Sequence, residues 1–134
     1  MLKVRSWFVA VVVIVIAGAV LSAAEKDFAT RWKEAETNVT AGPGQPYFKD
    51  TFFKDSQDKF SAHISACAKQ TGEVPTTDLR AAVELGSKGQ VLAVLLQAPS
   101  KTGGCFGERI KKDSFPAPPA DHFWVPVEMR FSKQ

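Results

Sequence analysis

The stretch that decides the fold runs from Asp78 to Gln97 and reads DLRAAVELGSKGQVLAVLLQ. In its first half, apolar side chains alternate with polar or small ones, which is typical of a β-strand with one buried face. The apolar positions are Leu79, Ala81, Val83 and Leu85. Gly86 to Gly89 has the composition of a tight turn, and Gln90 to Gln97 is apolar on both faces, which predicts a central or interface-facing strand. The two halves therefore predict a β-hairpin.

Two amphipathic helices are predicted before this hairpin. One covers residues 25–39, and the other runs from a cap at Asp50 or Thr51 to about Thr71, with a stop at Gly72. The apolar positions are Phe28, Trp32, Ala35 and Val39 in the first helix, and Phe53, Phe60, Ile64, Cys67 and Ala68 in the second. Residues 41–46 are rich in Gly and Pro and predict a loop between the helices.

A short helix and a last strand are predicted after the hairpin. Residues 99–104 favour a loop, and the apolar residues of 105–110 favour a short helix. The prolines in 114–119 exclude a helix or a central strand there. Apolar side chains alternate again over 122–131, where Pro126 indicates an edge or a bulge. This order of elements predicts an α+β fold, a small antiparallel three-stranded sheet packed against two to three helices.

The first 24 residues predict an export signal. Lys3 and Arg5 precede an apolar run, and small residues lead to a cleavage site between Ala24 and Glu25. An uncleaved inner-membrane anchor is the alternative, because 19 residues from Ser6 onward carry no charge and a spanning helix needs about 20. Both interpretations place the rest of the chain outside the cytoplasm, in the periplasm or secreted. Only the anchor would attach it to a membrane.

The charge of the remaining chain gives no basis for binding nucleic acid. Two of the 17 basic side chains lie in the first 24 residues, which leaves 15 against 14 acidic ones. Nucleic-acid binding relies on a clear excess of basic side chains. We therefore expect no nucleic-acid partner.

The two cysteines predict a disulfide. Cys67 and Cys105 both follow the export signal, and an even count in a small exported chain is typical of one disulfide. The alternative is a metal site that adds His63 and His122. The spacing contains no paired zinc motif, so we expect no metal.

Catalytic motifs are missing from the sequence, and we expect neither enzyme activity nor a cofactor. His63 and His122 have no nucleophile beside them in the sequence pattern. Trp124 falls in the polar phase of the last strand. It is either a binding anchor or is covered by the first helix, and we expect coverage, because that helix needs to bury its own aromatic side chains.

Residues 78–131 resemble the TonB-type carboxyl-terminal domain in a two-cysteine variant. The matching pieces are the hairpin, the helix CFGERIKKD, the turn SFPAP and the closing strand VPVEMRF. The resemblance covers about 55 residues and implies a protein-interaction module in which a sheet edge pairs with a partner. TonB proteins are inner-membrane-anchored energy transducers. This chain lacks their long Pro-rich linker and has no ionisable residue in 7–21, so energy transduction is not expected.

The leading hypothesis is an exported envelope protein that binds another protein through a sheet edge, with a homodimer as a further possibility. The predicted organisation is a signal over 1–24, a helix and loop over 25–46, and a TonB-like domain over 47–134. The candidate interaction edge comprises Phe123, Trp124, Val125, Glu128 and Arg130, and the face of Leu92, Val94 and Leu96 is a second candidate. The alternative function is a secreted inhibitor or a small-ligand-binding protein with a pocket between helix and sheet.

Overall fold

The computed structural model describes residues 27–98 and 100–131. The predicted export signal and its cleavage site at Ala24 and Glu25 lie outside the described residues. The elements are a helix over 27–40, α2 (Gly44–Pro46), η1 (Tyr47–Phe52), α3 (Phe53–Thr71), β1 (Leu79–Leu85), β2 (Val91–Leu96), α4 (Lys101–Ile110) and β3 (Phe123–Met129). The predicted α+β fold with a small antiparallel sheet is confirmed. None of the described helices is long and apolar enough to cross a membrane.

The three strands form one antiparallel sheet in the order β2-β1-β3, so β1 is central. Val83 of β1 lies opposite Val94 of β2 and Val125 of β3. Of the two predicted places for the strand over Gln90 to Gln97, the central one is wrong, because β2 is an edge, and the interface-facing one stays a prediction. β1 is central because it pairs with β2 along one edge and with β3 along the other. Small Ala82, in the polar phase of the pattern, lets a helix pack on the second face of the sheet.

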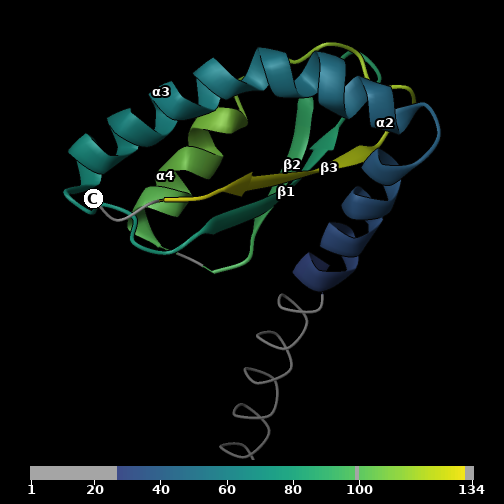
Figure 1. The fold of residues 1–134 in the computed structure, drawn as a ribbon. Coiled ribbons are helices and arrows are strands. Elements are labelled where there is room, and N and C mark those ends of the chain that lie inside the picture. Colours follow the sequence, from purple (N-terminus) through teal and green to yellow (C-terminus); the bar gives the residue numbers. More distant parts are fainter. Residues whose placement is uncertain (1–26, 99, 132–134) are drawn as a thin grey trace, which may run out of the picture.

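Helices cover both faces of this sheet (Figure 1). α3 and α4 lie on one face, and the main core there includes Phe52, Phe60, Phe106 and Phe115, which are in ring contact. Helix 27–40 covers the other face, where a smaller cluster forms from Phe28, Ala35, Ala82 and Trp124. The sheet is thus the middle layer of three.

The predicted loop over 41–46 is wrong in its second half, because Gly44–Pro46 is helical and continues directly into η1 and α3. Proline fits the first turn of a helix, where its missing N–H has no partner to lose. Gly44 is buried and sits against the carbonyl of Asn38 and the ring of Phe123. It permits close contact between helices there and does not interrupt the chain.

The π-helical turn η1 also changes which phenylalanine enters the core. A π-helix spaces equivalent positions five residues apart, so Tyr47 and Phe52 point to the same side. Both are buried, whereas Phe53 is 52% exposed. The prediction that Phe53 belongs to the buried face of the second helix is therefore wrong.

The second half of the chain follows the predictions more closely. Gly72 ends α3 in the left-handed conformation, and the turn from Gly86 to Gly89 closes the hairpin, as predicted. α4 begins earlier than predicted, because the Ser100 side chain caps it by accepting a hydrogen bond from the N–H of Gly103 at 2.9 Å. β3 is an edge strand, in agreement with Pro126.

The predicted disulfide is confirmed. Cys67 and Cys105 are bonded, which joins α3 to α4 across 38 positions of sequence. The hydroxyl of Thr102 donates to the carbonyl of Glu73 at 2.7 Å and lies 2.8 Å from the hydroxyl of Thr71. The amino end of α4 is therefore held against the carboxyl end of α3 by covalent and polar contacts.

Candidate functional site

The outer edge of β3 carries backbone groups that do not pair with the sheet. Pro126 lies opposite Ala82 in an unbroken register, and proline can occupy a ladder only where its missing N–H would point outward. Because an antiparallel ladder repeats every two residues, Trp124 and Glu128 also direct their N–H and C=O groups outward. The side-chain amide of Asn38 donates to the carbonyl of Trp124 at 3.1 Å, in agreement with this direction.

The unpaired part of this edge has a defined length. Asn38 occupies the carbonyl of Trp124 at one end. Within the described part of the chain, no hydrogen bond reaches the carbonyl of Pro126 or the N–H and C=O of Glu128. The open edge therefore offers one donor and two acceptors over Pro126 to Glu128.

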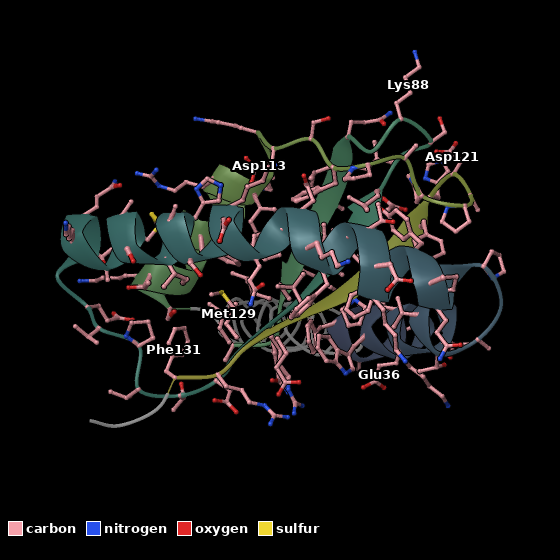
Figure 2. The ribbon with its side chains drawn as sticks, turned by 45° about the horizontal axis from the view of Figure 1, so that its top comes forward. Glu36, Lys88, Asp113, Asp121, Met129 and Phe131 are labelled. Carbon is pink, nitrogen blue, oxygen red and sulfur yellow. A yellow bond between two sulfur atoms is a disulfide. The ribbon has the colours of Figure 1, made fainter. Side chains whose placement is uncertain are left out.

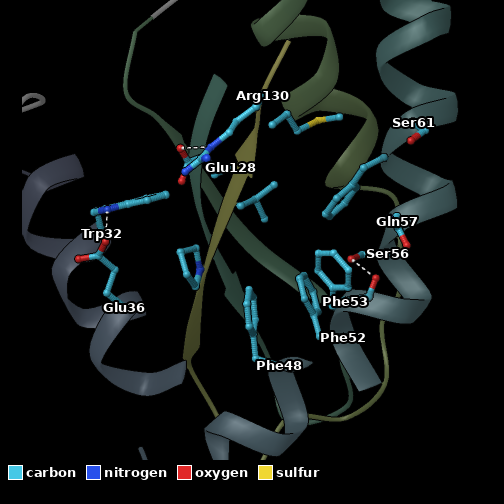
Figure 3. A pocket seen from close by; sticks show the side chains of 14 residues that line it. Trp32, Glu36, Phe48, Phe52, Phe53, Ser56, Gln57, Ser61, Glu128 and Arg130 are labelled. Atoms are coloured by element: carbon cyan, nitrogen blue, oxygen red, sulfur yellow. Dashed lines mark hydrogen bonds and ion pairs between the residues drawn. The ribbon is translucent and has the colours of Figure 1, made fainter. Parts of the chain in front are cut away.

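A groove of about 480 Å³ runs beside this open edge. Helix 27–40 contributes one wall and η1 with α3 contributes the other, with β3 between them (Figure 3). The lining residues are Trp32, Glu36, Phe48, Phe52, Phe53, Ser56, Gln57, Phe60, Ser61, Pro126, Val127, Glu128, Met129 and Arg130. The interior is thus mainly aromatic and aliphatic, with polar groups at the rim, which is the usual composition of a binding site.

Charged groups are held at one rim of the groove. The Glu128 carboxylate lies 3.3 Å from Nε of Arg130 and 3.5 Å from Nη2 of Arg80. The Arg80 guanidinium lies 5.5 Å from the centre of the Trp32 ring, and Nε1 of Trp32 donates to Glu36 at 2.9 Å. Trp32 is therefore fixed from two sides and presents a rigid surface to the groove.

Tyr47 fixes the opposite wall. Its hydroxyl donates to the carbonyl of Pro116 at 2.7 Å, which ties η1 to the segment before β3. Burial and, to a smaller extent, the nearby carboxylate of Asp55 together raise the pKa of Tyr47 to about 12. Phe48 and Phe52, on the same π-helical turn, are stacked with ring centres 5.8 Å apart.

The predicted interaction edge divides into buried and accessible residues. The side chains of Phe123, Trp124 and Val125 are buried, while Glu128 and Arg130 are exposed. A partner of this edge would therefore meet backbone groups and the groove, and not the aromatic side chains of β3.

The expected cover over Trp124 is confirmed. Trp124 is 5% exposed and packs with Phe28 and Ala35 of helix 27–40. Arg31 lies over its ring at 5.1 Å from the centre. Trp124 is a core residue of the second face of the sheet and is not a surface anchor.

The sequence patterns did not identify the aromatic wall of the groove. Phe48 fell next to the predicted loop, and Phe53 was assigned to the core. The signal that would have found the wall is the pair Phe52 and Phe53, because adjacent residues of a helix point about 100° apart and so face different surroundings.

The two histidines lie apart and in different surroundings. His63 lies on α3, and its Nε2 is 2.7 Å from the carboxylate of Asp113. Figure 2 shows Asp113 on the opposite side of α3 from Met129, which lines the groove. His122 contacts Glu84 and Asp121 beside the hairpin turn. The alternative metal site is excluded for the cysteines by their disulfide, and no group of three or more His, Cys, Asp or Glu residues in 27–98 and 100–131 is arranged to hold a metal ion.

Comparisons of the chain with protein-family models, with characterised proteins and with solved structures gave no match.

Proposed function

We propose that this protein is an interaction module that binds an extended segment of a partner protein by adding a strand to β3. The observation that carries the proposal is the unpaired backbone of Pro126 and Glu128 beside an aromatic groove. Strand addition draws affinity from such backbone groups and specificity from pockets for alternate side chains. The edge and the groove supply both requirements in one place.

The geometry defines the guest segment. Its alternate side chains would point to opposite sides, as in any strand. The side chains on one side of the guest strand would pack against the aromatic wall of Phe48, Phe52 and Phe53. Those on the other side would lie along Trp32 and the rim at Arg130. Because Asn38 blocks the edge at Trp124, the paired part of the guest is short, a few residues with apolar side chains at alternate positions.

The compartment we propose is outside the cytoplasm, with an envelope protein as the partner. The disulfide supports an oxidising compartment, because cytosolic thiols are kept reduced. The export signal predicted over 1–24 favours the same location. The resemblance of 78–131 to TonB-type domains favours use of a sheet edge.

A small apolar ligand in the same groove is a second candidate function. The groove volume of about 480 Å³ lies within the range of about 300–1,000 Å³ that is typical of small-molecule sites. Residues of helix 27–40 and of β3 both line the groove, which supports the alternative hypothesis of a pocket between helix and sheet. This ligand would need no backbone pairing with β3.

The test first selects peptides that bind the exported protein from a displayed random library. Each backbone N–H of a selected peptide is then N-methylated, one position at a time. We expect binding to be lost only on N-methylation of every second residue, because only alternate N–H groups face β3. Glu128→Pro, which removes the edge donor, and Phe53→Ser, which opens the exposed aromatic wall, should both weaken binding. Val74→Ser is the matched control, because Val74 is 74% exposed and does not line the groove.

Circular dichroism and thermal melting establish that each variant is folded. Since Phe53 is exposed, Phe53→Ser keeps the test valid if Glu128→Pro does not fold. Strand addition is contradicted if neither variant weakens binding, or if the loss of binding on N-methylation does not recur at every second residue of the peptide. A bound small molecule in native mass spectrometry that Phe53→Ser releases and Glu128→Pro retains would establish the second candidate.

A further inference from the structure

The second edge of the sheet, β2, lacks most of the usual protection. Natural edge strands carry charged residues, prolines or covering elements that prevent pairing with other chains. β3 has Pro126, Glu128 and the Asn38 contact. β2 reads VLAVLL and contains neither a charge nor a proline, and a single bulge opposite Glu84 and Leu85 is its only irregularity.

The backbone of β2 is open over its second half. The N–H of Gln97 donates to the carbonyl of Arg80 at 3.0 Å, so Gln97 faces β1. By the two-residue repeat, Val94 and Leu96 direct their N–H and C=O groups away from the sheet. In the part of the chain that the structure describes, no hydrogen bond reaches these groups.

There is room for another strand along this edge. A groove of about 330 Å³ is lined by Val94, Leu95 and Leu96, by residues 27–28 of the first helix, and by α4. Gly107 of α4 presents no side chain, and a Cβ there would lie 3.6 Å from Val94. Leu92, at the bulge, is 43% exposed.

We propose that β2 pairs with β2 of a second copy of this chain. An antiparallel pair with the two-fold axis at Leu95 places Leu95 opposite itself and Val94 opposite Leu96 of the second copy. Both of these pairs are apolar, and β2 itself carries no charged side chain. The rim of this groove has two acidic side chains, Asp27 and Glu108, and one basic side chain, Lys111. Two copies that meet here therefore bring together charges of both signs.

This pairing would join the two sheets into one with six strands. Both β3 edges would lie at the far ends, so each dimer would present two open grooves. The proposal does not depend on the function of β3, because β3 takes no part in the contact. With this axis only residues 94–96 of β2 lie opposite β2 of the second copy, and so short a contact buries less than the about 800 Å² per partner of a standard interface. We therefore expect a dimer that dissociates on dilution.

The first experiment uses the purified exported protein without substitutions. Analytical ultracentrifugation over a concentration series should show monomer and dimer. Hydrogen exchange should slow with concentration at the amides of Val94 and Leu96 and stay fast at Glu128. A protein that is monomeric throughout, with fast exchange at Val94 and Leu96, overturns the proposal, and so does a dimer that protects Glu128 instead.

The second experiment tests the axis by charge. Leu95→Lys and Leu95→Glu should each give monomers, because like charges would face each other across the two-fold axis. An equimolar mixture of the two should restore the dimer. Val74→Lys, an exposed control, should dimerise as the wild type does. If both Leu95 variants still dimerise, the proposed register is wrong, and if they unfold, the exchange experiment decides.

Discussion

Single side chains hold the walls and the end of the β3 groove in place. The Asn38 amide occupies the last carbonyl of the open edge, and the Tyr47 hydroxyl ties η1 to Pro116. Trp32 is held between Glu36 and Arg80. The Asn38 and Tyr47 contacts join segments that are distant in sequence, and Arg80 of β1 packs on the Trp32 ring of the first helix. The shape of the groove therefore depends on tertiary contacts between several elements.

Tyr47 should make stability depend on pH in the alkaline range. Its pKa is raised from 10.0 to about 12 in the folded protein, so its contribution is complete below pH 10. Above pH 10 the unfolded state loses the phenolic proton first, and the free energy of unfolding should fall as the pH rises to 12. Denaturation of wild type and Tyr47→Phe over this range isolates the effect, because only the wild-type curve contains it.

The same residue can be titrated directly. The chain contains one tyrosine, so the absorbance of tyrosinate reports Tyr47 alone. A folded protein in which this absorbance rises near pH 10 would contradict the buried hydroxyl described above.

At the scale of elements, the π-helical turn determines which aromatic side chains form the core and which form the groove. An ordinary helix through Tyr47 and Phe52 would not place both on the same side. The extra residue in the turn puts Phe52 in the core and leaves Phe53 at the groove.

Substitution of the two adjacent phenylalanines should therefore have unequal effects. Phe52→Ala should lower the free energy of unfolding by about 3–5 kcal/mol, as for other buried phenylalanines. Phe53→Ala should change it by less than about 0.5 kcal/mol, because the side chain is mostly exposed. Urea denaturation of the two variants measures the difference. Equal losses would show that the helix has an ordinary α-helical phase here.

The strands and the carboxyl ends of the helices were predictable because local patterns determine them. Alternation over 79–85 and the glycines at Gly72 and Gly86 act within a few residues. The central position of β1 was not predictable in this way, because it depends on the pairing of β1 with β3, which is distant in sequence. The groove was not predictable for a different reason, because a π-helical turn as short as η1 leaves no periodic signal in the sequence.

At the scale of the molecule, two unequal cores hold the three layers together, and one covalent bond joins the two helices of a single layer. The disulfide lies between α3 and α4, on the side of the main core. Helix 27–40 is attached by the smaller core and by Asn38. The sheet between these layers has one edge in each of two grooves.

Removal of the disulfide should lower stability by a large amount. Cys67→Ala combined with Cys105→Ala releases a loop of 38 positions, which the chain-entropy relation values at about 4 kcal/mol. Urea denaturation of this variant and of the wild type gives the difference. The mass of the wild type under non-reducing conditions should be two hydrogens below that of the reduced chain, and free alkylation of both cysteines in the native protein would contradict this.

The position of Trp32 in the groove wall has an optical consequence. Apart from Trp7, which lies in the segment predicted to be removed on export, the chain has only Trp32 and Trp124. Trp124 is enclosed beneath helix 27–40, whereas Trp32 borders the β3 groove. Occupancy of the groove should therefore change the emission of one indole and leave the other as an internal reference. Residues 25–134 therefore contain an intrinsic fluorescent reporter of groove occupancy, and no label is needed to follow it.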